Sequence, residues 1–153
     1  MPIATKSEKL RISSEKKTEE LAKEFTKKLK PGHIVFIYGE IGVGKTTFVR
    51  YLINQLQKMN KLKETEVLSP TFNLLNEYEI GQIKISHYDL FRLKKKDEIK
   101  NLDIFDDVSK KITLIEWPQL ISQRPKNLVE LNFEYGKEDK ERLVKIIGLE
   151  IKI

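Results

Sequence analysis

The chain has 153 residues, of which 39% are hydrophobic and 34% are charged, and its formal net charge is +6. This composition is typical of a soluble globular protein, and the length predicts one domain over residues 1–153. There is no cysteine, which excludes a disulfide framework and a thiolate metal site. The sequence shows neither the apolar core of a signal peptide nor a membrane-spanning run, so we expect a cytoplasmic protein without membrane contact.

The positive net charge permits nucleic-acid binding but does not indicate it. Basic residues are scattered and often stand beside acidic ones, as in residues 137–142. Residues 94–96 form the one dense lysine run, and no aromatic residue interleaves it. We interpret this run as a solvated loop.

The N-terminal part predicts a short strand and an amphipathic helix. Residues 10–14 favour an edge strand, and Ser13 or Ser14 provides an N-cap for a helix that begins near Glu15. Apolar residues then recur at helical spacing until Pro31, followed by glycine, ends the helix. The expected buried stripe consists of Leu21, Ala22, Phe25 and Leu29.

The strongest functional signal is a match to the phosphate-binding pattern G-x-x-x-x-G-K-[ST]. Its fixed positions are Gly39, Gly44, Lys45 and Thr46. The β-branched and aromatic run at residues 33–38 predicts a buried strand, and residues 46–56 predict an amphipathic helix. Because the pattern requires this strand–loop–helix context, a glycine-rich turn that matches by chance is the weaker interpretation.

The residue types in this loop suit a nucleoside triphosphate with Mg²⁺. Glycines let backbone N–H groups approach phosphate oxygens, and a helix N-terminus adds donors and partial positive charge. Lys45 is expected to reach the β- and γ-phosphates, and the Thr46 hydroxyl to bind Mg²⁺. The predicted nucleotide-binding loop consists of Gly39, Glu40, Ile41, Gly42, Val43, Gly44, Lys45, Thr46 and Thr47.

The middle of the chain predicts a β-hairpin followed by a helix. After a polar linker at residues 57–66, two β-prone runs at 73–79 and 82–88 flank Gly81, which favours a hairpin. Residues 97–109 predict a helix, because apolar residues recur there at spacings of three. These apolar positions are Ile99, Leu102 and Phe105.

An acidic residue follows the buried strand predicted at residues 111–115. Glu116 stands at the carboxyl end of this strand, as the magnesium-organising acid of P-loop proteins does. Ligands of open α/β sheets gather at the carboxyl ends of strands, so Glu116 and the P-loop should converge. A Mg²⁺ role is favoured over an ordinary strand-end acid. Strands at 127–135 and 141–149 complete an α/β fold with a P-loop NTPase-like central sheet, flanking helices and β-hairpins.

Four further residues need an interpretation, and the sequence alone does not decide their roles. Asp89, at a strand end, orients or deprotonates an attacking water, or else initiates a turn by bonding its own backbone. Thr71, in a proline-stiffened loop, is a weak candidate for a γ-phosphate sensor. We interpret His87 as a hydrogen-bonded structural histidine, and Trp117 as a core or rim packing residue rather than a base-stacking one.

Four sequence blocks give the chain a resemblance to a known family. They are Gly39-Glu-Ile-Gly-Val-Gly-Lys-Thr-Thr-Phe-Val-Arg50, Ser69-Pro-Thr-Phe72, His87-Tyr-Asp-Leu-Phe-Arg-Leu93 and Leu114-Ile-Glu-Trp-Pro118. On these blocks the chain resembles the TsaE family, formerly called YjeE, the P-loop ATPase of bacterial tRNA threonylcarbamoyladenosine (t6A) biosynthesis. The first block occurs in many NTPases, whereas the other three together are specific.

The resemblance implies a compact P-loop fold, a cytoplasmic location and binding of ATP and ADP with Mg²⁺. It also implies two partners, TsaB and the TsaD subunit that modifies adenosine 37 of tRNA, and a role in resetting the TsaD–TsaB assembly between turnovers. Direct contact with tRNA stays open. Since no arginine clearly supplies a finger for the nucleotide, we expect a slow ATPase that partners stimulate.

The resemblance also assigns roles to individual residues. Lys45 and Thr46 bind phosphate and Mg²⁺, and Glu116 completes the metal site. Asp89 is important for hydrolysis, and residues 69–72, which include Thr71, behave as a switch-like loop. A segment at residues 13–18 is similar to one that lies near the nucleotide base. On that similarity, the nucleotide-binding candidates in this segment are Glu15 and Thr18.

Three rival classes share parts of this pattern. A small-molecule or nucleoside kinase, the leading alternative, needs an acceptor pocket and a lid with paired arginines, but arginine is sparse after the P-loop. A regulatory GTPase needs Asn-Lys-x-Asp and Asp-x-x-Gly motifs, and neither occurs. A scaffold or nucleic-acid protein that only holds nucleotide is weakly disfavoured by the presence of both Glu116 and Asp89.

Overall fold

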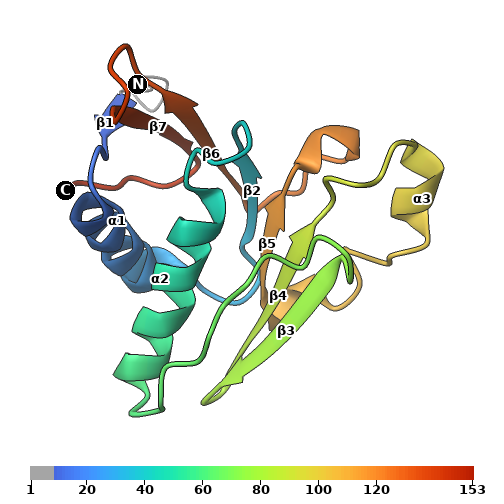
Figure 1. Cartoon of the computed structure of the whole chain (residues 1–153). Coiled ribbons are helices and arrows are strands. Elements are labelled where there is room, and N and C mark those ends of the chain that lie inside the picture. Colours follow the sequence, from blue (N-terminus) through green and yellow to red (C-terminus); the bar gives the residue numbers. More distant parts are fainter. Residues whose placement is uncertain (1–8) are drawn as a thin grey trace, which may run out of the picture.

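The computed structural model describes residues 9–153, and Figure 1 shows their arrangement. Within these residues seven strands form one sheet in the order β1-β7-β6-β2-β5-β4-β3. The strands are β1 (Lys9–Arg11), β2 (Ile34–Tyr38), β3 (Leu75–Ile80), β4 (Ile83–Asp89), β5 (Ile112–Glu116), β6 (Leu128–Tyr135) and β7 (Arg142–Ile147). The helices are α1 (Glu15–Lys28), α2 (Lys45–Met59) and α3 (Lys96–Lys100), with 3₁₀ helices η2 (Val108–Lys110) and η3 (Pro118–Leu120).

The centre of the sheet is parallel and its edges are antiparallel. β2 lies between β6 and β5, and β4 follows β5, with every one of these pairs parallel. The outer strands β1, β7 and β3 pair antiparallel with their neighbours. The carboxyl ends of the four parallel strands therefore meet at one edge of the sheet, where open α/β sheets bind ligands. The α/β fold class predicted from the sequence is confirmed.

Two apolar clusters cover the two faces of the sheet. On one face α1 and α2 lie side by side (Figure 1), and the rings of Phe25 and Phe48 pack edge to face with centroids 5.2 Å apart. On the other face, side chains from the segment at residues 90–121, among them Ile104, pack on Phe36 of β2. Within residues 9–153, no helix has both the length and the apolar character needed to cross a membrane.

The predicted N-terminal elements are confirmed. Ser14 is the N-cap of α1, and its hydroxyl accepts a hydrogen bond from the Lys17 backbone N–H at 3.2 Å. The edge strand is shorter than the predicted range 10–14. Ser13 lies outside β1, and its hydroxyl instead accepts a hydrogen bond from the backbone N–H of Arg142, where β7 begins.

The strand and helix around the P-loop are confirmed, as is the hairpin of β3 and β4, whose turn has Gly81 at φ 62°. The predicted linker at residues 57–66 is wrong at its start, because α2 continues to Met59. Gln57 is buried in this last turn, and its side-chain amide donates to the Thr65 hydroxyl at 2.8 Å. A polar residue can extend the helix here because the following segment folds back to satisfy it.

The helix predicted at residues 97–109 is wrong over most of its length. Only α3 forms, and the chain then makes turns until η2. Asp103 and Asp107 adopt positive φ values of 50° and 55°, which a right-handed helix cannot contain. Aspartate tolerates this conformation and its side chain competes for backbone hydrogen bonds, so the apolar spacing of three did not decide the structure.

The buried Thr113 side chain allows a test of how an unpaired polar group affects the stability of the core. It is fully buried in β5, and its hydroxyl has no hydrogen-bond partner within residues 9–153. Thr113→Val removes this unpaired polar group with little change of shape, so we expect the free energy of unfolding to rise by about 1 kcal/mol. Denaturant unfolding followed by circular dichroism measures the change. Thr113→Ser, which keeps the hydroxyl and loses the methyl, should unfold more easily; a destabilised Val variant would contradict the assignment.

Candidate nucleotide-binding site

The loop between β2 and α2 turns tightly at the N-terminus of α2. Gly39, Gly42 and Gly44 have positive φ values of 149°, 79° and 118°. A Cβ on Gly39 would lie 2.7 Å from the Val43 Cγ1 atom and 3.0 Å from the Phe133 carbonyl oxygen, so only glycine fits there. Val43 is buried in the core and anchors the loop to the sheet.

A cleft of about 360 Å³ opens beside this loop. Its walls come from the loop, the start of α2, the segment at residues 69–71 and the carboxyl ends of β4 and β5. The cleft thus brings together chain segments that are far apart in the sequence. The predicted site residues that line it are Ile41, Gly42, Gly44, Lys45, Thr46, Thr47, Thr71, Asp89 and Glu116.

The Thr46 hydroxyl and the Glu116 carboxylate, which both line this cleft, are in contact. Thr46 Oγ1 donates to Glu116 Oε1 at 3.0 Å and lies 3.3 Å from Oε2. Glu116 is only 2% exposed, and its Oε2 also lies 2.6 Å from His87 Nε2. The convergence of Glu116 and the P-loop expected from the parallel sheet is therefore present. The metal role of the two residues stays a prediction.

The Lys45 ammonium lies against backbone carbonyls and an aromatic face. Its Nζ donates to the Gly39 carbonyl and lies 3.4 Å from the Glu40 carbonyl oxygen. The centroid of the Trp117 ring is 3.6 Å from the same nitrogen, a cation–π contact. Burial lowers the pKa of Lys45, while the nearby carboxylates of the cleft, Glu116 first, raise it.

Asp89 holds the segment at residues 69–71 against the cleft. Its Oδ2 accepts hydrogen bonds from the Ser69 hydroxyl and, at 3.0 Å, from the Thr71 hydroxyl. Its Oδ1 accepts from the Phe91 backbone N–H at 2.9 Å, the local turn bond considered from the sequence. Asp89 is 3% exposed. The carboxylate thus accepts the local turn hydrogen bond and also binds the loop at residues 69–71. Its part in hydrolysis stays a prediction.

The same loop is fixed from its other side by Arg92. The guanidinium donates two hydrogen bonds to the Phe72 carbonyl oxygen, at 3.2 and 3.1 Å from Nε and Nη2. The Phe72 side chain nevertheless points away from the core and is 86% exposed. Arg92 therefore fixes the backbone of this loop without burying the Phe72 side chain.

Glu15 and Thr18 do not line this cleft. Glu15 pairs with Arg50 at 3.1 Å, and the Thr18 hydroxyl donates to the Ser14 carbonyl oxygen at 3.4 Å. Both residues lie in the N-terminal part of α1. Their role near a nucleotide base stays a prediction.

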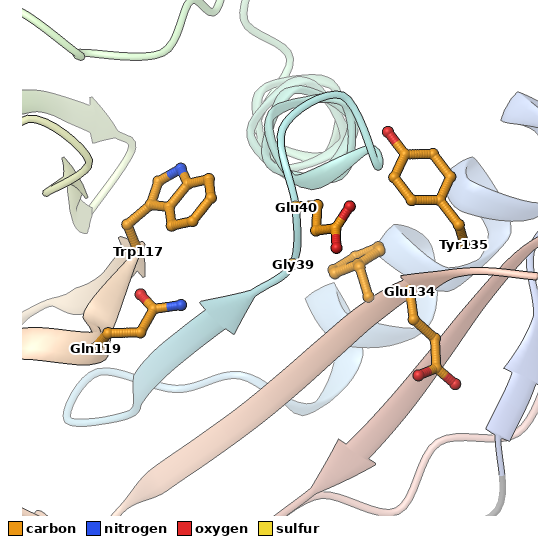
Figure 2. A pocket seen from close by; sticks show the side chains of 7 residues that line it. Gly39, Glu40, Trp117, Gln119, Glu134 and Tyr135 are labelled. Carbon is orange, nitrogen blue, oxygen red and sulfur yellow. The ribbon is translucent and has the colours of Figure 1, made fainter.

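A second cavity of about 440 Å³ lies beside Gly39 and Glu40. Figure 2 shows Trp117 on one side of Gly39 and Tyr135 on the other. The Tyr135 hydroxyl donates to the Ile41 carbonyl oxygen at 2.7 Å, so β6 supports the P-loop from this side. Glu40 lines this second cavity and not the cleft that contains Thr46.

Three residues in or beside the site were not assigned to it from the sequence. The interpretation of His87 as a hydrogen-bonded structural residue is confirmed, but its partner is Glu116. Trp117 packs on Phe91, with ring centroids 4.8 Å apart, and also lines both cavities. Its position directly after Glu116 was the available signal. No signal pointed to Tyr135, whose contact with the P-loop spans 94 residues.

The parallel sheet, the glycine-rich turn into α2 and the Thr46–Glu116 pair at the strand ends define a protein of the P-loop NTPase fold class. Comparison with protein families narrows the class. The model of the family described as threonylcarbamoyl adenosine biosynthesis protein TsaE matches residues 12–144, and the chain belongs to this family. The resemblance found from the four sequence blocks is thereby confirmed.

Several curated proteins named tRNA threonylcarbamoyladenosine biosynthesis protein TsaE are similar to this chain. That of Rickettsia bellii is 41% identical over 130 residues, which cover 84% of this chain and 88% of the relative. That of Aquifex aeolicus is 33% identical over 132 residues, covering 86% and 90%. The crystal structure of Bacillus subtilis YdiB superposes with a TM-score of 0.70 at 23% identity, covering 94% of this chain and 87% of that one, which supports the fold.

The hydrogen bonds of Asp89 predict how the loop depends on it. Asp89→Ala removes the acceptor of the Ser69 and Thr71 hydroxyls, so we expect amide hydrogen exchange in residues 69–73 to accelerate about tenfold. Hydrogen–deuterium exchange with mass spectrometry measures this change. Asp97→Ala, which alters an exposed aspartate of α3, is the matched control. Equal exchange in the Asp89 variant and the wild type would show that the loop is held by other contacts.

Proposed function

We propose that this protein binds and hydrolyses ATP in tRNA N6-threonylcarbamoyladenosine (t6A37) biosynthesis, acting in the cytoplasm on the TsaD–TsaB complex so that the complex completes many turnovers. Membership of the TsaE family supports the pathway. The contact of 3.0 Å between the Thr46 hydroxyl and the Glu116 carboxylate supports ATP binding and hydrolysis with Mg²⁺, because a P-loop protein holds Mg²⁺ between these residue types.

The donor set suits Mg²⁺. This ion prefers oxygen ligands, usually takes only one or two protein side chains, and completes its coordination with phosphate oxygens and water. Thr46 and Glu116 supply one hydroxyl and one carboxylate in contact at the edge of the cleft. When bound, Mg²⁺ withdraws charge from the phosphate oxygens and thus lowers the barrier to phosphoryl transfer.

Lys45 and the N-terminus of α2 bind the triphosphate. The Lys45 ammonium rests on the Gly39 carbonyl and the Trp117 ring, both of which are weaker partners than a phosphate oxygen. Exchange of these partners for the β- and γ-phosphates therefore favours binding. The loop from Gly39 to Thr47 adds backbone N–H donors at a helix start, where the peptide dipoles also attract anions.

Asp89 and Thr71 serve the hydrolytic step. The Thr71 hydroxyl turns from Asp89 Oδ2 to the γ-phosphate when ATP is bound. Asp89 Oδ2 then loses one of its two hydroxyl donors and can accept a hydrogen bond, or the proton, from the attacking water. In this scheme the loop at residues 69–72 reports the presence of the γ-phosphate, as switch loops do.

The arginines support the need for a partner. None of those in residues 9–153 lines the cleft that contains Thr46. Four of them have contacts elsewhere: Arg50 with Glu15, Arg92 with Phe72, Arg124 with Glu130 and Arg142 with Tyr135. Arginine fingers accelerate phosphoryl transfer on the order of 10³-fold or more, so we expect slow hydrolysis by the isolated protein.

ATP turnover with Mg²⁺, measured for the protein alone and with purified TsaB and TsaD, tests this function. We expect a low rate alone that rises at least about tenfold with the two partners, together with multiple rounds of t6A formation on tRNA. Hydrolysis that ignores the partners, without effect on t6A, would contradict the proposal. Phosphate transfer to a small molecule would instead favour the kinase alternative.

Two variants separate binding from hydrolysis. Lys45→Ala removes the charged donor for the phosphates, so nucleotide affinity should fall on the order of 100-fold. Asp89→Ala should bind nucleotide within about threefold of the wild type but lose turnover roughly 100-fold, because it removes a water-orienting or basic group. Calorimetric titration and phosphate release measure the two effects. Normal hydrolysis by Asp89→Ala would show that its assignment is wrong.

A further inference from the structure

A buried histidine contacts the carboxylate that we assign to the metal. His87 Nε2 lies 2.6 Å from Glu116 Oε2, and the two side chains are 0% and 2% exposed. Carboxylate oxygens accept hydrogen bonds, so this short contact fits a ring proton on Nε2 that His87 donates to Glu116. The other ring nitrogen, Nδ1, has no hydrogen-bond partner within residues 9–153. The imidazole thus directs its one observed side-chain hydrogen bond at Glu116.

We propose that His87 is a positioning residue for Glu116 and thereby sets the Mg²⁺-dependent part of nucleotide binding. It holds Oε2, so that Oε1 stays with the Thr46 hydroxyl at the edge of the cleft. This inference rests on the proposed function, because it takes Glu116 as a ligand of the metal. His87 itself does not line the cleft.

The geometry at Glu116 shows why such a residue is needed. Thr46 Oγ1 is 3.0 Å from one carboxylate oxygen and 3.3 Å from the other, so Thr46 alone distinguishes them weakly. The hydrogen bond from His87 to Oε2 removes this ambiguity and leaves Oε1 as the oxygen nearest to Thr46. Partners that orient a metal ligand in this way commonly change metal affinity 10- to 100-fold.

The sheet places His87 rigidly for this task. In the parallel pairing of β4 with β5, His87 lies opposite Leu114 and Asp89 lies opposite Glu116. Alternate residues of a strand face the same side, so one strand presents both the histidine that fixes Glu116 and the aspartate that holds Thr71. β4 lies inside the sheet, between β3 and β5, and its hydrogen bonds limit any shift of the imidazole.

Two matched variants test the donated hydrogen bond. The side-chain nitrogen of glutamine in His87→Gln reaches the position of Nε2, whereas that of asparagine in His87→Asn reaches only the position of Nδ1. Titration calorimetry with ADP, in Mg²⁺ and in EDTA, separates metal-linked binding from the rest. In EDTA we expect the ADP affinity of His87→Asn to stay within about twofold of that of the wild type. The increase in ADP affinity that Mg²⁺ causes should be about tenfold smaller than in the wild type. His87→Gln should retain most of that gain.

Thr113→Val and Glu116→Gln complete the experiment. Thr113→Val changes a buried polar side chain of β5 that has no hydrogen-bond partner within residues 9–153, and this variant should respond to Mg²⁺ as the wild type does. If Mg²⁺ no longer raises the ADP affinity of Glu116→Gln but still raises that of His87→Asn as in the wild type, the positioning role is overturned and the metal site stands. If Glu116→Gln keeps the gain, both the metal assignment and the inference fall. Equal losses in the asparagine and glutamine variants would also overturn the inference.

Nitrogen NMR of the wild type gives a second readout that needs no altered His87. The chain has two histidines, so His33→Asn assigns the signals. We expect the His87 ring to carry its proton on Nε2, and the Nε2 shift to change with ADP and Mg²⁺ but little with ADP in EDTA. A proton on Nδ1, or equal shifts in both conditions, would overturn the positioning role.

Discussion

The first turn of α2 and the end of β5 meet through the Thr46 hydroxyl and the Glu116 carboxylate, 3.0 Å apart, and the cleft depends on this contact. It exists because β5 pairs in parallel with β2, so both strands deliver their carboxyl ends to one edge of the sheet. The loop after β2 then turns at Gly39 into α2, which brings the helix N-terminus to the same edge. The strand order therefore brings the P-loop and the end of β5 to the same edge of the sheet.

Buried charges around this contact are each satisfied by several donors or acceptors. Glu116 accepts from Thr46 and shares a hydrogen bond with His87, and Asp89 accepts from two hydroxyls and one backbone N–H. The Lys45 ammonium has carbonyl oxygens and an aromatic face. Burying a charge costs free energy unless it is paired or hydrogen-bonded, so these contacts hold the charged groups where a nucleotide would need them. The Thr71 hydroxyl donates to Asp89, so the position of the loop at residues 69–71 depends on this carboxylate.

Much of this arrangement could be predicted from local sequence patterns. The β-prone run before Gly39 and the amphipathic pattern at residues 46–56 predicted β2 and α2, and the strand-end position of Glu116 predicted its approach to the P-loop. The helix expected at residues 97–109 failed because two aspartates adopt positive φ, which apolar spacing does not reveal.

Contacts between distant parts of the chain were out of reach of local patterns. His87 and Glu116 are 29 residues apart, and Tyr135 and Ile41 are 94 apart. Each pair depends on the strand order β6-β2-β5-β4, which the sequence alone did not specify. The assignment of His87 to a structural role was correct as far as burial and hydrogen bonding go, but only the pairing of β4 with β5 brings it to the predicted metal ligand.

A double-mutant cycle of Thr46→Val and Glu116→Gln tests the central claim most directly, with the gain in ADP affinity from Mg²⁺ as the measured quantity. Residues that hold one ion as a unit show non-additive losses. We therefore expect each single variant to lose most of the Mg²⁺ gain, and the double variant to lose little more than either alone. Losses that multiply as for independent sites, or a Mg²⁺ gain that survives both substitutions, would contradict a metal site built on the contact between α2 and β5.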